Sequence, residues 1–138
     1  MQTTSAYQEN LLCDTLDRMR RNPEGRKVVH MHISKLLPAN RTPVKSKIVS
    51  RMFGNLESGM HVQVFPMVNQ DLVMTVNAGS QRDVNAICNR IRALFDDDPV
   101  TYTEDDQGND QFVAWYDLEV DSALAIGMAQ DLKASAGE

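Results

Sequence analysis

The sequence is poor in cysteine, in positive charge and in long apolar runs, and each shortage excludes a class of protein. The 138 residues include two cysteines, Cys13 and Cys88, and neither has the CxxC or Cys/His spacing of a metal or redox motif. We therefore expect two buried, free thiols. No apolar run approaches the ~20 residues that a membrane-spanning helix requires, and the first ten residues lack the basic and apolar segments of a secretion signal. The sequence predicts a soluble, cytoplasmic protein with no membrane insertion.

The scarce positive charge is also unevenly distributed. The chain has 14 Lys and Arg against 19 Asp and Glu, which gives a net charge of −5. Residues 1–55 contain ten of the basic residues and four of the acidic ones, whereas residues 56–138 contain four and fifteen. This balance argues against a general nucleic-acid-binding protein. What remains is a 42% hydrophobic chain with the length of one domain and enough apolar residues for one core.

Apolar periodicity predicts an alternation of helices and strands. Helical spacing is found in four segments, of which the third is the clearest and the last the weakest: 5–21, 43–58, 84–95 and 120–138. Alternating or β-rich patterns are found in four others: 26–33, 60–66, 71–77 and 112–118. The acidic segment between the third helix and the last strand is expected to be a solvated loop, with a short strand at 100–103.

The element order α-β-α-β-β-α-β-α restricts the topology. Because right-handed crossovers place each connecting helix on a face of the sheet, the central βαββαβ unit predicts a ferredoxin-like α+β fold. Its antiparallel sheet would have the order 4-1-3-2, with the two crossover helices on one face and two flanking helices outside. We expect one domain over residues 1–138, with its core at about 26–119, an N-terminal helix in 1–25 and a C-terminal helix or linker in 120–138.

Two segments of the chain resemble parts of a known family. The stretch MHISKLLPANRTPVKSKIVSRMF, residues 31–53, is similar to the first strand, loop and helix of the GGDEF domain, a palm-like nucleotide cyclase that makes cyclic di-GMP. The hairpin PMVNQDLVMTV, residues 66–76, falls where that family carries its GGDEF signature. The resemblance spans roughly residues 27–118 and agrees in the order of the elements.

The first segment departs from the family at positions that carry chemistry. Asn40 stands where the family has the Asn that contacts guanine, and Leu36 stands in place of an aromatic residue. His32 replaces the metal-binding carboxylate of the first strand, Ser34 replaces the second Asp of that motif, and Arg41 replaces the Asp after the Asn. The resemblance therefore implies a nucleotide pocket that has lost most of its metal ligands.

The hairpin turn departs from the family in the same way. Val68 and Asn69 occupy the positions of the two glycines, and Gln70, Asp71 and Leu72 stand over the Asp, Glu and Phe. Because Mg²⁺ prefers carboxylate oxygens, Asp71 alone remains as an anionic ligand. We therefore expect no enzyme activity and no cofactor. Asn69 and Asp71 tolerate left-handed backbone and bond to it locally, so the turn is predicted to be a structural hairpin.

These departures favour a catalytically inactive, GGDEF-like regulatory or protein-interaction module, which could dimerise or form the N-terminal part of a larger signalling protein. An alternative is a sensor that binds GTP or a related nucleotide without turnover. Its pocket would be lined by these residues: His32, Asn40, Arg41, Lys45, Asn69, Gln70 and Asp71. A further alternative is an unrelated ferredoxin-like domain for protein binding or dimerisation.

His30 and His32 leave one more alternative open. An H-x-H pattern on a strand places both imidazoles on one face and could begin a zinc or copper site. Such a site needs a third ligand, which His61 or Asp71 could supply if the strands pair suitably. The simpler interpretation is that the histidines make hydrogen bonds on a partly covered face of the sheet, and we therefore predict no metal.

Overall fold

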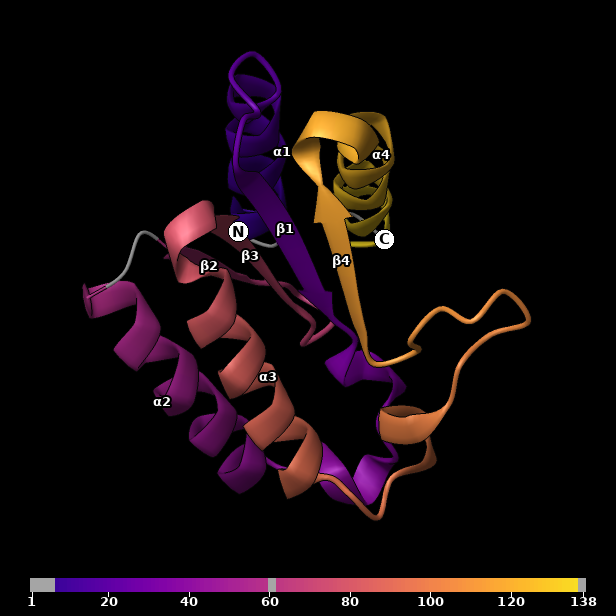
Figure 1. The fold of residues 1–138 in the computed structure, drawn as a ribbon. Helices are drawn as coiled ribbons and strands as arrows, with labels where there is room; N and C mark the ends of the chain where they lie inside the picture. The colour runs from indigo at the N-terminus through magenta and orange to yellow at the C-terminus, as the bar shows by residue number, and fades with distance from the viewer. Residues whose placement is uncertain (1–6, 60–61, 137–138) are drawn as a thin grey trace.

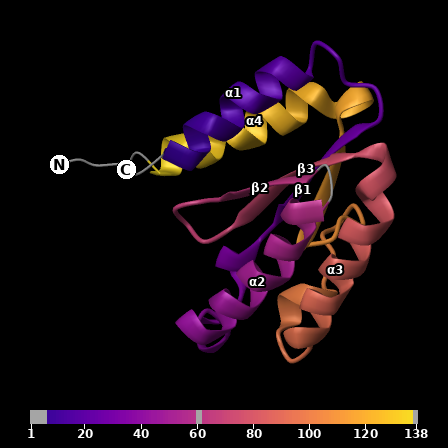
Figure 2. The same ribbon diagram turned by 90° about the vertical axis from the view of Figure 1, so that its left-hand side faces the viewer.

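A four-stranded antiparallel sheet separates two pairs of helices (Figure 1, Figure 2). The computed structural model describes residues 7–59 and 62–136, apart from the side chains of residues 55–59. The elements are, in chain order, α1 (Tyr7–Met19), β1 (Arg26–Met31), α2 (Pro43–Gly59), β2 (Val62–Pro66), β3 (Leu72–Asn77), α3 (Gln81–Leu94), β4 (Val113–Asp117) and α4 (Leu118–Ala136). The predicted element ends at residues 5–6, 60–61 and 137–138 lie outside the described residues.

The strand order is β2-β3-β1-β4, and every neighbouring pair is antiparallel. Read from the β4 edge, this is the predicted strand order 4-1-3-2. β1 is central, so that Val29 lies opposite Met74 of β3 on one side and Trp115 of β4 on the other. The predicted α+β fold with a four-stranded antiparallel sheet is confirmed. None of the helices in the described ranges is both long and apolar enough to cross a membrane.

Alternation along β1 supplies two hydrophobic cores, one on each face of the sheet. Val29 and Met31 pack with the crossover helices α2 and α3, whereas Val28 packs with α1 and α4. The second core includes Leu12 and Leu16, which the helical spacing of the first segment places on one face. The flanking helices therefore cover the sheet face that the crossover helices leave open, and they lie side by side (Figure 2).

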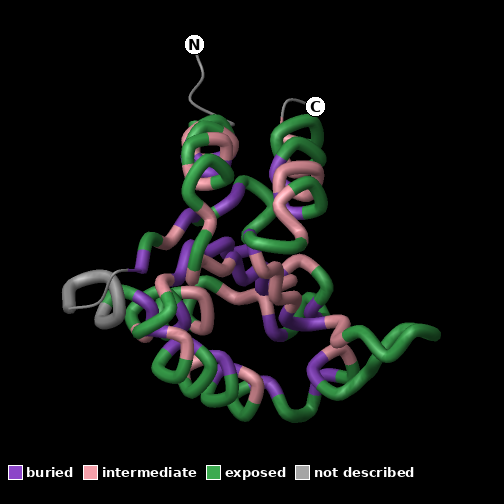
Figure 3. Tube along the Cα trace, turned by 45° about the horizontal axis from the view of Figure 1, so that its top comes forward, coloured by how far each residue is buried: buried purple, intermediate pink, exposed green. Residues whose placement is uncertain are grey.

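The segment between α3 and β4 differs from its prediction. Residues 100–103 were expected to contain a strand, but Pro99–Tyr102 form a 3₁₀ turn. The reason is local: the side chain of Asp98 accepts a hydrogen bond from the Val100 N–H, and Pro99 supplies the fixed φ of a first turn. Asp98 and Thr101 are buried, so the expected solvated loop is correct for residues 96, 97, 99 and 102–109, which are exposed, but not for the whole segment (Figure 3).

The predicted apolar faces of α2 are only partly used. Val49 and Phe53 are buried in the core, as expected, but Val44 and Ile48 on the neighbouring stripe are exposed. The two stripes are adjacent on the helix surface, and the sheet covers only one of them. Both cysteines are free, as predicted, and Cys88 is buried, but the predicted burial is wrong for Cys13, which is half-buried.

Substitution of two apolar residues on α2 should therefore have very different effects on stability. Phe53 is 1% exposed and Val44 is 69% exposed. We expect Phe53→Ala to lower the free energy of unfolding by about 3 to 5 kcal/mol, because it leaves a cavity in the core. Val44→Ala should change it by less than about 0.5 kcal/mol. Urea denaturation followed by circular dichroism measures both values, and equal losses would show that α2 is not oriented as described.

Candidate functional site

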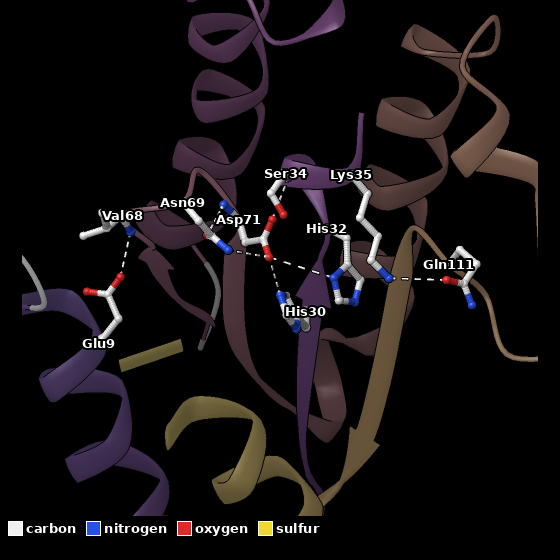
Figure 4. Close-up of polar contacts among 9 residues, drawn as sticks. All are labelled: Glu9, His30, His32, Ser34, Lys35, Val68, Asn69, Asp71 and Gln111. Carbon is white, nitrogen blue, oxygen red and sulfur yellow. Dashed lines mark hydrogen bonds and ion pairs between the residues drawn. The ribbon is translucent and has the colours of Figure 1, made fainter. Parts of the chain in front are cut away.

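The residues predicted to line a nucleotide pocket lie in two neighbouring groups at one end of the sheet. The first group surrounds the end of β1 and the turn between β2 and β3, and it contains His32, Asn69, Gln70 and Asp71 (Figure 4). The second group, Asn40, Arg41 and Lys45, belongs to the loop between β1 and α2 and to the first turn of that helix.

Asp71 is the centre of the first group and is only 2% exposed. Its Oδ2 accepts hydrogen bonds from Nε2 of His30 at 2.8 Å and from Nδ2 of Asn69 at 3.2 Å. Its Oδ1 accepts a hydrogen bond from the backbone N–H of Ser34 at 2.8 Å. Burial alone would raise the pKa of Asp71, but the hydrogen bonds from His30 and Ser34 hold it below its usual value. The carboxylate that was expected to remain as a metal ligand is thus bonded to three groups of the protein.

The turn itself is a tight hairpin, as predicted, although the left-handed residue is a different one. Gln70 has a φ of 82°, whereas Asn69 and Asp71 do not have positive φ. The side chain of Asn69 instead accepts a hydrogen bond from the N–H of Asp71 at 2.9 Å, which forms an Asx turn. The turn is closed by the N–H of Met67, which donates to the carbonyl of Asp71 at 2.8 Å.

The sequence analysis missed Glu9, which attaches the turn to α1. Its side chain is buried, and its Oε2 accepts a hydrogen bond from the N–H of Val68 at 2.6 Å (Figure 4). Its Oε1 is buried and has no hydrogen-bond partner. A signal was available, because Glu9 shares a helical face with Leu12 and Leu16, where an acidic side chain needs a polar partner.

His30 and His32 lie side by side next to Asp71. Their ring centroids are 3.9 Å apart, and Nδ1 of His32 is 3.9 Å from Oδ2 of Asp71. His30 is buried and makes the hydrogen bond that the sequence analysis expected. Burial lowers the pKa of His32 to about 4, and positive charge at His30 and at Lys35 adds to this effect. At neutral pH the His32 ring is therefore uncharged.

These three side chains bring potential metal-ligating atoms together. One such atom from each of His30, His32 and Asp71 lies within 4.8 Å of the other two. Asp71 is thus the third residue that the H-x-H pattern required. His61, the other candidate for that role, lies outside the described residues.

In the second group, the polar side chains bond to the protein itself. Asn40 is buried; its Nδ2 donates to Oδ2 of Asp98 at 3.0 Å, and its Oδ1 accepts from Nζ of Lys45 at 2.6 Å. Asp98 also accepts from the N–H of Leu37 at 2.7 Å. The side-chain groups with which Asn40 was expected to contact guanine therefore hold the loop to the acidic segment. Nε of Arg41 is buried and has no hydrogen-bond partner.

The space between the two groups is too small for a nucleotide. Asn40 and Gln70 line a cavity of about 40 Å³, whose remaining walls include Ile33, Leu72 and Phe95. A pocket for a small organic ligand has a volume of roughly 300 to 1,000 Å³, whereas about 10 to 15 Å³ is enough for one water molecule. The cavity therefore has room for a few waters at most.

A much larger hollow lies along the outer edge of β4, where the sequence analysis predicted no site. This groove has a volume of about 700 Å³ and runs between β4 and α4. Consecutive residues from Val113 to Tyr116 line one wall, and Leu124, Met128 and Asp131 belong to the other. Leu124 is 65% exposed. The predicted order 4-1-3-2 already places this strand at the edge of the sheet, but no signal in the sequence could identify the groove, because it depends on how α4 packs beside β4.

No family model, no curated protein and no solved structure matches this chain.

The lowered pKa of His32 predicts a loss of stability in mild acid. The ordinary pKa is 6.5 and the folded value is about 4, so between these pH values the unfolded chain binds a proton that the folded chain does not. We expect the free energy of unfolding to fall by about 1 to 2 kcal/mol between pH 7 and pH 5. Urea denaturation at a series of pH values measures this slope.

His32→Asn is the matched control for this slope. The variant lacks the titrating ring and should lose most of the pH dependence above pH 5. The lowered pKa of Asp71 affects stability only at lower pH, as the carboxylate becomes protonated, and so falls outside this window. An unchanged slope in His32→Asn would show that another group is responsible.

Proposed function

We propose that this protein is a catalytically inactive interaction module that binds an extended segment of a partner protein along the open edge of β4. The groove beside β4 carries this proposal, because it has a volume of about 700 Å³ and lies along an open strand edge, which can pair with an extended segment, whereas the cavity at the expected nucleotide site measures about 40 Å³. The partner is a protein segment rather than a nucleotide.

We further propose that the fold is ferredoxin-like and that the chain is a degenerate relative of GGDEF domains. The strand order, read as β4-β1-β3-β2, supports the first part, as does the packing of both crossover helices on one face. The position of Asp71 in the turn between β2 and β3, next to the end of β1, supports the second, since the resemblance places the signature there.

The proposed absence of cyclase activity is supported by the shortage of oxygen ligands near Asp71. Phosphoryl transfer by two metal ions needs several hard oxygen ligands. Asp71 is the one carboxylate in the group that it forms with His32, Asn69 and Gln70, and its Oδ1 is bonded to the N–H of Ser34. Asn40, expected to recognise guanine, is bonded to Asp98 and Lys45. The residues of the resembled active site have structural roles here.

The edge of β4 has the features of a site for β-strand addition. The backbone N–H and C=O groups of a strand point alternately to its two sides. The inner side of β4 pairs with β1, and within residues 7–59 and 62–136 no strand pairs with its outer side. A partner segment in extended conformation could use these free donors and acceptors, and its side chains would contact the groove. The side chains of Trp115 and Leu124 provide apolar contacts there.

The charge of the groove indicates the chemistry of the partner segment. Asp121 and Asp131 line it together with Asp110, and Asp110 is already paired with Arg92. The neighbouring exposed loop 102–109 adds further carboxylates. A segment that alternates apolar and basic residues would complement this surface in both respects.

Filling the groove should abolish binding without unfolding the protein. A Cβ at Gly127 would meet no atom within 4 Å, so Gly127→Leu is expected to fold and to place its side chain in the groove. Gly54→Leu on α2 is the matched control, since a Cβ there also has open space. Against a displayed library of 12-residue peptides, the wild type and the control should select sequences with alternating apolar and basic residues. Gly127→Leu should bind the selected peptides at least tenfold more weakly.

Other outcomes would overturn this assignment. Equal binding by Gly127→Leu and Gly54→Leu would place the peptide site elsewhere. Selection of acidic peptides would contradict the charge argument. If light scattering showed a dimer that becomes a monomer only in Gly127→Leu, a second copy of this chain, rather than a partner segment, would occupy the edge.

The nucleotide alternative is tested by adding GTP and Mg²⁺. A ligand with a Kd of 10 μM would stabilise the native state by about 2.7 kcal/mol at 1 mM, which raises the melting temperature by several degrees. We expect no such rise, and no cyclic di-GMP by chromatography, because the cavity between Asn40 and Gln70 is too small. A rise that disappears in Asn40→Ala would restore the sensor hypothesis.

A further inference from the structure

The geometry points to a site for a divalent first-row transition metal, with Zn²⁺ as its reference ion, formed by His30, His32 and Asp71. The two histidines come from the end of β1, and the carboxylate comes from the turn that precedes β3 (Figure 4). This site is separate from the peptide groove proposed above, and its metal is not the Mg²⁺ of a cyclase.

The donor atoms are close to the spacing that zinc requires. At metal–ligand distances of about 2.0 to 2.1 Å, two donors of a tetrahedral site lie roughly 3.3 Å apart. Oδ2 of Asp71 is 2.8 Å from Nε2 of His30 and 3.9 Å from Nδ1 of His32. The first separation must increase and the second decrease, each by roughly half an ångström. Rotations of the side chains are enough for such changes, and the strands need not move.

The surrounding hydrogen bonds prepare Asp71 to act as a ligand through one oxygen. Oδ1 is held by the N–H of Ser34 at 2.8 Å, which leaves Oδ2 directed at the two rings. Outer hydrogen bonds of this kind fix the orientation of metal ligands. The side chain of His32 is 20% exposed, so a water molecule could reach the fourth position from that side.

One nitrogen of the cluster of His30, His32 and Asp71 makes no hydrogen bond within the protein. Nδ1 of His30 is buried and has no hydrogen-bond partner, although His30 itself is 5% exposed. A buried ring with one unpaired nitrogen is costly, and such atoms are rare in folded proteins. When a metal binds Nε2 of His30, the proton on that nitrogen moves to Nδ1, so the ring stays neutral and the hydrogen bond to Oδ2 of Asp71 is replaced by a bond from each residue to the metal.

The type of ligands decides which metals fit. Two imidazoles and one carboxylate suit Zn²⁺, Co²⁺ and their neighbours, whereas Mg²⁺ and Ca²⁺ prefer a shell made entirely of oxygen. Only one of the three ligands here is an oxygen donor. Mg²⁺ and Ca²⁺ should therefore not compete for the site.

The experiment uses the full chain freed of metal with a chelator and then titrated with Co²⁺ and Zn²⁺. We expect one Co²⁺ per chain, with the visible absorption bands of a tetrahedral N/O site, and displacement of Co²⁺ by one equivalent of Zn²⁺. A hundredfold excess of Mg²⁺ should leave the spectrum unchanged. The affinity for Zn²⁺ is then measured by competition with a chromogenic chelator.

Two variants decide the result. Nδ1 of His32 is 3.9 Å from Asp71, too far for a hydrogen bond, so His32→Asn should fold like the wild type and bind Zn²⁺ at least tenfold more weakly. Lys35→Gln is the control: it removes an exposed neighbouring side chain that is not one of the three ligands, and it should bind normally. Near-ultraviolet circular dichroism of the metal-free proteins checks their folding. Equal affinities of the wild type and His32→Asn would overturn the proposal, and so would loss of binding in Lys35→Gln or the absence of tetrahedral bands.

Discussion

Two segments that are distant in the sequence, the end of β1 with the loop after it and the hairpin between β2 and β3, meet at the buried carboxylate of Asp71. It accepts hydrogen bonds from His30 in β1, from Ser34 in the turn after β1, and from Asn69 in its own hairpin. A hydrogen bond to a charged group contributes roughly 1.5 to 3 kcal/mol, and a buried charge without partners is strongly destabilising. The end of β1, the hairpin and the start of the following loop can therefore keep their positions only together.

A second buried carboxylate repeats this arrangement on the other side of the same loop. The carboxylate of Asp98 accepts hydrogen bonds from Nδ2 of Asn40 and from the N–H of Leu37. Asp98 also begins the 3₁₀ turn that follows α3. The loop between β1 and α2 is thus held at both of its ends by acidic residues from elsewhere in the chain. This explains why a region that resembles a nucleotide-binding loop contains so little free space.

The two sides of the molecule are consequently suited to different tasks. At the end of β1 the polar groups are buried, close together and mostly bonded to one another, which favours a compact ion over an organic ligand. Along the edge of β4 the backbone is open, and the groove combines apolar with acidic side chains. Both proposals follow from this division, and each can be correct without the other.

The sequence by itself determined the elements, because their signals are local. Helical spacing from Pro43 onward predicted α2, and alternation along β1 separated Val29 from Val28 and so assigned them to opposite cores. Even the H-x-H pattern was correct in placing two rings side by side.

Only the tertiary structure decided how the polar residues are used. Asn40 and Asp98 are 58 positions apart, and no local pattern predicts that they meet in a buried hydrogen bond. No local pattern predicts the hydrogen bond between Glu9 and the hairpin either. Nor does one predict which of the two apolar stripes of α2 is buried. The groove depends on how α4 packs beside the edge strand β4. Such features arise when elements that are complete in themselves come together, because burial and pairing are properties of contacts between segments and not of any segment alone.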